Sequence, residues 1–445
     1  MRYLVSLLRI NRLIAGTLLL MSRTEHHSNH VALVKHLIAD IDRLISEQLS
    51  LVMAHRKFTA LEARWRALHE LVNLPVNYKT VRVKILNIAW SEISQDLNIS
   101  PSVKQAKLYN LIANREFNTM GGEPYGLVVI DHNISLDIDY ANEFDDIYTL
   151  ELLAELGEKS LCPIVLDADE AFLGAIGESF LCDTAKIKRV LAAHDFESWH
   201  RLRAKDNSHF IGLVFNKVGY RRIYRFHPAG FVFDEEADDN FRWGNTATTF
   251  LKNVMIEFNR VRWFGFLKSR KLDGSGGSAI SYYGAKKDDL PVVFKTRISA
   301  SNAAFISQLG LIPIFHNPLN ERYFFQSNSS IKVENETENR YLIQTTLMVS
   351  RIAHYLKVQL REMIGSSMEA HDCENRLTHW LEQYCSNSIV SDEMTLAKMP
   401  LKSAKVSVVE ESGEFKRYGC HVDLVPQYQF DRVASTVSLS TAVER

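Results

Sequence analysis

Apolar residues recur at three- and four-residue steps through residues 341–372, which is the pattern of a helix with one buried face. This apolar stripe consists of Val349, Ile352, Ala353, Leu356, Leu360, Met363 and Ile364. The opposite face carries a basic ridge of Arg351, His354, Lys357 and Arg361. No proline falls in the stretch and its first glycine is Gly365, so the helix is predicted to continue to that residue. The basic ridge is either a solvated polar face or a surface that meets an acidic neighbour.

Two more helical stripes precede this one near the N-terminus. The first consists of Val34, Leu37, Ile38, Ile41, Leu44, Ile45, Leu49 and Val52, and the second of Phe58, Leu61, Trp65, Leu68 and Val72. We expect a helical hairpin or a bent helix in which both stripes are buried. His55 and His69 lack a second pair of ligands at zinc spacing, so capping or packing roles are favoured over metal binding.

Residues 127–330 alternate between short apolar runs typical of strands and runs typical of helices. The expected strands are 127–130, 162–166, 210–215, 291–294 and 311–315. The expected helices lie near 149–156, 185–193, 243–258 and 300–309. This alternation predicts an α/β core with a largely parallel or mixed sheet. Before this core, Val81, Val83 and Ile85 alternate as in a strand, and residues 104–117 are predicted to form a helix.

Three strand-like runs close the chain. The first alternates Ala404, Val406 and Val408, and the second Tyr418, Cys420, Val422 and Leu424. The third, Ala434 to Val443, contains no charge and no proline. One side of it would carry Val433, Val437, Leu439 and Val443, and the other Thr436, Ser438 and Ser440. An uncharged terminal strand with open edges is an aggregation risk unless another strand pairs with it.

The composition is that of an ordinary globular protein, with 46% hydrophobic and 24% charged residues among 445. At about 100–200 residues per domain, this length allows two to four domains. Lys+Arg 52 against Asp+Glu 53 gives a net charge of -1, which argues against a nucleic-acid or anionic-membrane binder. The five cysteines form no CxxC pair, which favours reduced thiols and a cytoplasmic location.

The first residues superficially resemble a secretory signal peptide. Arg2, Arg9 and Arg12 precede or adjoin an apolar run at residues 13–21. This run is shorter than the about 20 residues of a membrane-spanning helix, and no small-residue cleavage site follows it. Secretion is therefore disfavoured. The segment is alternatively a short amphipathic peptide for a partner, or Met21 is the true start.

Segments that could suggest chemistry lack the residues that the chemistry requires. Gly121 and Gly122 precede a strand rather than a helix, without the lysine of a phosphate-binding loop. Residues 174–177 lack the third glycine and the acidic residue of a dinucleotide site. The acidic run at 234–239 does not have EF-hand spacing, so a solvated loop is favoured. Nothing resembles a nucleophile elbow. We predict no catalytic residue, no cofactor and no metal.

The residues around the long helix resemble a known family. Ser350-Arg351, Ala353 to Val358, Ile364-Gly365-Ser366 and Trp380 resemble the most recognisable block of the large subunit of the type VI secretion contractile sheath, TssC or VipB. Further similar blocks lie at residues 41–72, 117–126, 195–213 and 233–245. The resemblance covers about residues 31–445 and is weakest between about 265 and 290.

The resemblance implies a contractile-tail-sheath-like subunit of mixed α/β fold. The parts it implies are an N-terminal extension (1–30), a helical or mixed segment (31–120), a central α/β sheath core (121–340), a helical segment (341–400) and C-terminal strands for contacts between subunits (401–445). In this family, terminal strands like the third run are exchanged between neighbouring subunits, so residues 433 and 436–440 and Val443 are candidate exchange positions.

The resemblance also implies a mechanical function without enzymatic activity. The chain would pair with a small sheath subunit (TssB or VipA) and polymerise with its own copies around an inner tube of Hcp-like protein, which sheath contraction propels. A baseplate and a ClpV-like AAA+ unfoldase are further possible partners, whereas nucleic acid and membrane are not expected. Two alternatives remain open: a non-enzymatic adaptor or baseplate component of the same system, and an α/β enzyme with an unrecognised site.

Overall fold

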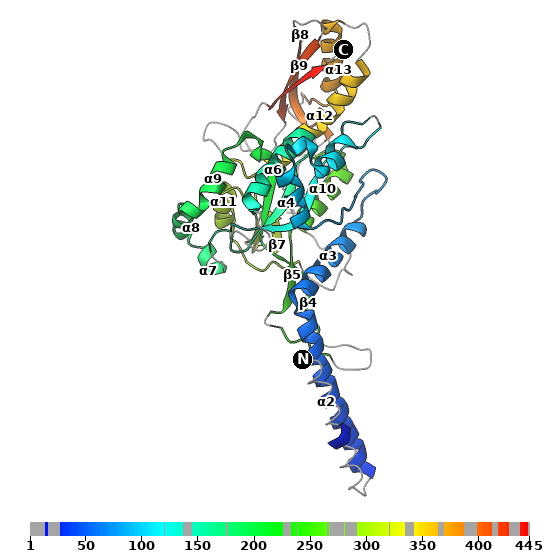
Figure 1. The fold of residues 1–445 in the computed structure, drawn as a ribbon, viewed down its shortest axis with the longest axis vertical. Helices are drawn as coiled ribbons and strands as arrows, with labels where there is room; N and C mark the ends of the chain where they lie inside the picture. The colour runs from blue at the N-terminus through cyan, green and yellow to red at the C-terminus, as the bar shows by residue number, and fades with distance from the viewer. Residues whose placement is uncertain are drawn as a thin grey trace. The chain divides into compact units, whose positions relative to one another are not determined.

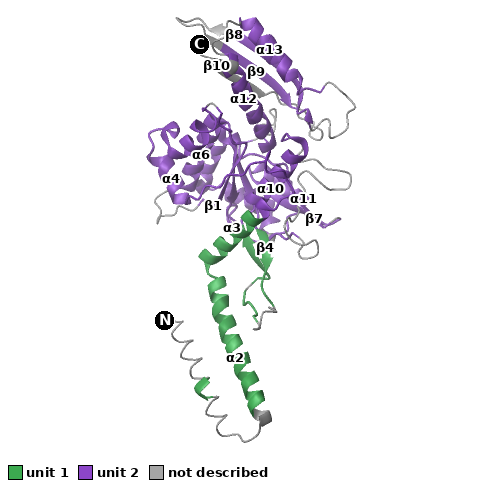
Figure 2. Cartoon of the chain, turned by 90° about the vertical axis from the view of Figure 1, so that its right-hand side faces the viewer, with its two compact units in different colours: residues 1–69, 218–244 green, residues 70–217, 245–445 purple. Residues whose placement is uncertain are grey.

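The protein is described by a computed structural model. The described residues are 14–16, 27–119, 121–136, 145–174, 177–225, 233–237, 239–264, 267, 280, 292–319, 321–333, 342–363, 369–386, 398–411, 417–426 and 437–443. The chain divides into two compact units (Figure 2). Unit 1 comprises residues 1–69 and 218–244, and unit 2 comprises residues 70–217 and 245–445.

Unit 2, drawn with the rest of the chain in Figure 1, is built on a five-stranded mixed sheet. The pairing of its strands gives the order β1-β2-β3-β6-β7. Its strands are β1 (Val128–Ile134), β2 (Ile164–Ala168), β3 (Ile211–Phe215), β6 (Ile312–Asn317) and β7 (Arg322–Phe325). The pairs from β1 to β6 are parallel and β7 is antiparallel to β6, so the expected mixed sheet is confirmed. The strand expected at 291–294 is wrong, because only an isolated bridge at Phe294 occurs among the described residues there.

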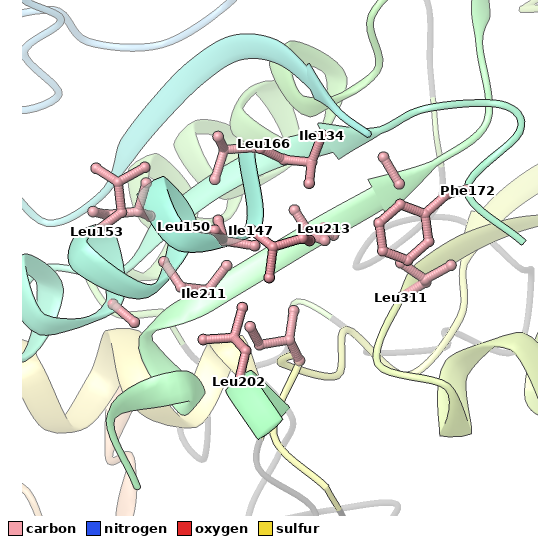
Figure 3. Close-up of a cluster of buried hydrophobic side chains, with 14 of the residues drawn as sticks. Ile134, Ile147, Leu150, Leu153, Leu166, Phe172, Leu202, Ile211, Leu213 and Leu311 are labelled. Atoms are coloured by element: carbon pink, nitrogen blue, oxygen red, sulfur yellow. The ribbon is translucent and has the colours of Figure 1, made fainter. Parts of the chain in front are cut away.

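Helices cover both faces of this sheet. On one face, α6 (Asp146–Ser160), α9 (Glu197–Arg203) and α11 (Ala300–Gln308) join alternate residues of the strands in a large buried cluster (Figure 3). On the other face, α10 (Ala247–Val261) contacts β1, β2 and β3, and none of its residues belongs to that cluster. Strands covered on both faces are apolar throughout, which explains the continuous apolar runs in the sequence.

Shorter helical segments complete this core. They are α4 (Trp90–Ile99), η1 (Val103–Gln105), α5 (Lys107–Tyr109), η2 (Asn110–Asn114), α7 (Glu178–Leu181), α8 (Thr184–Leu191), η3 (His194–Phe196) and η4 (Asp206–Phe210). The helix expected at 104–117 is confirmed over residues 107–114, where α5 and η2 adjoin, whereas residues 103–105 form a separate helical turn. The carboxylate of Asp96 accepts hydrogen bonds from the backbone N–H groups of Lys107 and Leu108, at 3.1 and 2.9 Å, so the helix restarts there.

The C-terminal part of unit 2 contains two helices and a second sheet. The elements are α12 (Ile343–Met363), α13 (Ala370–Glu382), β8 (Leu401–Glu411), β9 (Arg417–Pro426) and β10 (Val437–Val443). The three strands are antiparallel in the order β10-β9-β8. The three strand-like runs of the sequence are thereby confirmed as strands.

Unit 1 contains α2 (His27–Met53), most of α3 (Arg56–Val72), β4 (Val218–Arg222) and β5 (Phe241–Gly244). The side chain of Arg221 donates hydrogen bonds to Glu62 on α3 and to Glu235, which also accepts from Arg242. Glu235 is only 1% exposed. The expectation of a solvated acidic loop is therefore wrong at this residue. Its carboxylate can be buried because the side chains of Arg221 and Arg242 pair with it and neutralise its charge.

Candidate assembly surfaces

The apolar stripe of α12 is buried, as the sequence predicts. Its described members are Val349, Ile352, Ala353, Leu356, Leu360 and Met363. Five of these six, all except Ala353, share a buried cluster with Leu377 of α13, Leu401 of β8 and Val422 of β9. The helix is thus a core element that packs against α13 and the C-terminal sheet within unit 2. Ile364 and Gly365 lie outside the described residues.

The basic ridge of α12 is not a continuous exposed surface, because His354 is buried. Its Nε2 atom lies 3.4 Å from the carbonyl oxygen of Ser160, and its ring packs against the ring of Phe117 at a centroid distance of 4.9 Å. Burial lowers the pKa of His354 to about 4. Helical spacing alone placed His354 with Arg351 and Lys357, but the segment that contains Phe117 covers this position.

The three other residues of the ridge are partly exposed and contact their own chain. Lys357 donates to Asn118 Oδ1 at 2.6 Å, and its Nζ lies 3.6 Å from the ring centroid of Phe117. Arg361 donates to the carbonyl oxygen of Phe117 at 3.4 Å. Arg351 donates to the hydroxyl of Tyr355 at 3.0 Å. Contact of Arg351, Lys357 and Arg361 with another subunit stays a prediction.

The candidate exchange strand pairs within its own chain. Ser438 of β10 lies opposite Asp423, Leu439 opposite Val422, and Ser440 opposite His421. Because β10 is the last strand in the sheet order, only its β9-facing edge is paired among the described strands. Val433 and Thr436 lie outside the described residues, and strand exchange by Val437 to Ser440 and Val443 stays a prediction.

The N-terminal helices leave apolar side chains exposed, so the expected burial of both stripes is wrong. On α2, a row that we name the α2 seam repeats at alternating steps of three and four residues: Val31, Val34, Ile38, Ile41, Ile45, Gln48 and Val52. Ile38 is 53% and Val52 is 56% exposed, and Trp65 on α3 is 66% exposed. Helical periodicity predicts that a face is covered; it does not reveal whether the cover comes from the same chain.

The α2 seam has the spacing of a coiled-coil interface. Its three-four alternation keeps one face of a helix toward a partner helix over three heptads, and six of its seven positions are Val or Ile. By contrast, Leu44 and Met53 lie off the seam and are buried. An apolar row of this length at the surface is typical of a protein–protein contact.

Polar groups gather where the parallel strands end, which is where α/β enzymes commonly bind ligands. Asp167 is fully buried and accepts from the backbone N–H groups of Thr246 and Ala247 at 2.7 and 3.0 Å. Burial raises the pKa of Asp167 to about 7. Lys217 donates to Asn245 at 2.8 Å, and Asn245 donates to Asp131 at 2.6 Å.

These groups satisfy one another and fix the start of α10. The carboxylate that accepts from the first N–H groups of α10 is that of Asp167. Sequence reasoning missed Asp167 because it lies far away along the chain. Among the described residues, no group of three or more His, Cys, Asp and Glu is placed to hold a metal ion. No described helix combines the length and the apolar character needed to span a membrane.

Comparison with solved structures finds sheath proteins. The helical sheath of the anti-feeding prophage in its contracted state has a TM-score of 0.35 at 11% identity, with 65% of this chain and 60% of that chain covered. The sheath tail protein from Desulfitobacterium hafniense has a TM-score of 0.32 at 8% identity, with 69% and 62% covered. These scores are low, and the chain spans less than two thirds of each structure.

Comparison of sequences is more informative. The type VI secretion system sheath protein TssC1 of Pseudomonas aeruginosa is 26% identical over 428 residues, which cover 91% of this chain and 84% of that protein. The family model VipB, described as EvpB/VC_A0108, tail sheath N-terminal domain, matches residues 35–332. The model VipB_2, described as EvpB/VC_A0108, tail sheath gpW/gp25-like domain, matches residues 333–443. Since the two matches adjoin and together span both the α/β core and the C-terminal sheet, the chain belongs to the VipB family of contractile tail sheath proteins.

Proposed function

We propose that this chain is the large structural subunit of a type VI secretion contractile sheath, and that it pairs with a small sheath subunit before it polymerises. The observation that carries the proposal is the unbroken match to the two sheath family models from residue 35 to residue 443. Assembly of many copies with a partner also gives a reason for the apolar surface that the single chain exposes.

We place the main contact with the small subunit on the α2 seam. Its apolar side chains are exposed over most of the helix, and its spacing fits a helix of another protein better than a strand or a loop. Burial of each exposed Val or Ile would stabilise the complex by about 1–3 kcal/mol at most, since the side chains are already partly covered. Several such positions in a row would support a stable heterodimer.

A substitution pair on α2 tests this contact. Ile38→Asp introduces a charge in the seam, whereas His36→Asp introduces the same residue at an exposed position on the opposite side of the helix. We expect Ile38→Asp to reduce recovery of the co-expressed small subunit at least tenfold and His36→Asp to leave it near the unmodified level. Circular dichroism of both variants checks that the chain remains folded. Equal recovery with both variants would contradict the contact.

The remaining parts of the proposal concern the assembled sheath. Its copies would stack helically around an Hcp-like inner tube on a baseplate in the cytoplasm, and a ClpV-like unfoldase would recycle the contracted form. Energy for contraction would reside in two alternative packings of the same subunit contacts. Catalysis is not part of this mechanism, so saturable ATP hydrolysis by the pure chain, abolished by a single substitution in it, would contradict the proposal.

A further inference from the structure

An exposed apolar segment follows α3 in unit 2. Residues 82–89 are all exposed, and the backbone runs through them without helix, turn, bend or sheet pairing. Val83, Ile85, Leu86 and Ile88 are 37%, 63%, 55% and 36% exposed. The sequence here has the alternating, β-branched character of a strand, and the structure gives it no strand partner among the described residues.

Two ion pairs hold this segment in place. Arg82 pairs with Glu123, and Lys84 Nζ lies 2.5 Å from a carboxylate oxygen of Glu116. The other oxygen of Glu116 accepts from the backbone N–H of Glu123 at 3.0 Å, so both pairs engage one loop. Lys84 Nζ also lies 5.2 Å from the ring centroid of Tyr125. The side chains at alternate positions thus anchor the segment, although its backbone makes no regular pairing.

The backbone of this segment is free to pair. Among the described residues, no backbone N–H or carbonyl group of residues 82–88 takes part in a backbone hydrogen bond. An exposed row of unpaired peptide groups flanked by apolar side chains is a template for another strand and an aggregation risk if left open. In the polymer proposed above, this segment would therefore need a partner strand.

We propose that residues 82–88 form an acceptor strand that pairs with an extended apolar segment of the small sheath subunit. This inference rests on the proposed function and adds a second, chemically different contact to the helical contact of the α2 seam. Main-chain hydrogen bonds would supply the pairing, and Val83, Ile85, Leu86 and Ile88 would select an apolar partner strand.

Pairing of two copies of this segment fits a sheath less well. A parallel, in-register pair would place Arg82 opposite Arg82 and Lys84 opposite Lys84, and like charges directly opposite destabilise a strand pair. An antiparallel pair would be related by a two-fold axis, and such an interface closes on itself as a dimer instead of extending a polymer. A strand from a different polypeptide avoids both problems.

Amide hydrogen exchange on the full chain, alone and in complex with the co-expressed small subunit, tests this proposal. We expect the amides of residues 82–88 to exchange rapidly in the chain alone and at least tenfold more slowly in the complex. Protection of α2 without protection of 82–88 would overturn this inference and leave the proposed function intact. If no complex forms, the proposed function itself fails. Protection of 82–88 in the chain alone would overturn the inference, because the partner would then be the same chain or a second copy.

A proline comparison separates backbone pairing from side-chain contact. Successive amides of a strand point to opposite edges, so one added strand uses the N–H of Ile85 or that of Leu86, but not both. We expect either Ile85→Pro or Leu86→Pro to weaken the complex at least tenfold more than alanine at the same position. If neither proline differs from its alanine control, strand pairing is overturned. Both prolines replace residues in an exposed backbone without hydrogen bonds to other backbone groups, so we expect the fold to tolerate them, and circular dichroism of each variant checks this.

Discussion

The imidazole ring of His354 is buried in unit 2, where it makes one hydrogen bond and one contact with another ring. With Nε2 donating toward the carbonyl oxygen of Ser160, Nδ1 is an acceptor that has no hydrogen-bond partner among the described residues. A buried acceptor without a partner costs free energy, and a second proton on this ring would cost more because Arg351 and Lys357 lie nearby. The neutral form is therefore part of the folded state.

His354 should contribute a loss of stability in mild acid. The pKa of His354 is about 4 in the folded chain against 6.5 for the free side chain, so between these values the unfolded chain binds a proton that the folded chain does not. The contribution of His354 to the free energy of unfolding should therefore decrease as pH falls from 6.5 toward 4, by up to about 1.4 kcal/mol per pH unit. Asp167, whose pKa is raised to about 7, contributes in the opposite sense, so the part due to the histidine is the difference in slope between the unmodified chain and a His354 variant. Urea unfolding at pH 7 and pH 5 measures this slope.

The control for this slope is a pair of glutamine variants. His354→Gln should be less stable at pH 7 but should lose less stability than the unmodified chain between pH 7 and pH 5. His379→Gln changes a histidine whose side chain is 82% exposed, and it should leave the slope unchanged. An equal slope in all three proteins would mean that protonation of His354 is not coupled to unfolding.

Asp167, at the carboxyl end of β2, has a comparable structural role. Asp167→Ala should destabilise unit 2 by about 1–3 kcal/mol, because the N–H groups of Thr246 and Ala247 lose their buried acceptor. Asp167→Asn retains one acceptor oxygen and should recover part of this loss. The midpoint of urea unfolding measures both variants. If the two variants are equally stable, capping of α10 is not the role of this side chain.

Sequence patterns did not reveal that Asp167 and His354 are buried, because their partners come from elsewhere in the fold. Asp167 and Thr246 are 79 positions apart, and His354 and Ser160 are 194 apart. A helical period assigns each residue to a face but cannot specify what lies opposite that face. The buried Glu235 was misassigned for the same reason, since an acidic run favours solvent until Arg221 and Arg242 are placed beside it.

At the scale of elements, periodicity gave correct helices and strands where one face is covered by the same chain. The apolar stripe of α12 is buried as expected, and the runs at the C-terminus form β8, β9 and β10. Periodicity misled for α2, α3 and residues 82–89, which have the patterns of a buried helix or strand but are exposed here. The proposed function gives these failures one physical cause: the pattern would record burial in an assembly, whereas the structure contains one chain.

The terminal strand β10 provides a test at this scale. Deletion from Ala434, or Ser438→Pro, should leave soluble heterodimers with the small subunit but prevent long tubes. Each main-chain hydrogen bond contributes only about 0.5–1.5 kcal/mol net, yet the bonds of one strand recur in every subunit of a polymer. Electron microscopy scores the tubes and size-exclusion chromatography the heterodimers, with Ser438→Ala as the control.

Two results would contradict or revise the role proposed for β10. Normal tubes from the deletion variant would contradict strand exchange. Loss of the heterodimer itself would mean that β10, which pairs with β9 in the isolated chain, is needed for the stability of the C-terminal sheet. The second result would leave the α/β core and its match to the sheath family unaffected.

At the scale of the whole molecule, the alternation of strands and helices predicted the mixed α/β class correctly, and sequence blocks indicated the sheath family that the family models establish. The chain order of β1, β2, β3 and β6 matches their order in the sheet, as expected for strands joined by helical connections. Assembly could be anticipated only from the resemblance, because the contacts that create a sheath lie between subunits.

The central claim is that this chain builds a tubular sheath with a small partner subunit. Negative-stain electron microscopy of the chain co-expressed with its small sheath subunit tests it most directly, with the chain expressed alone for comparison. We expect long hollow tubes of uniform diameter from co-expression and none from the chain alone. A stable heterodimer that never polymerises would contradict a sheath role and favour an adaptor or baseplate component.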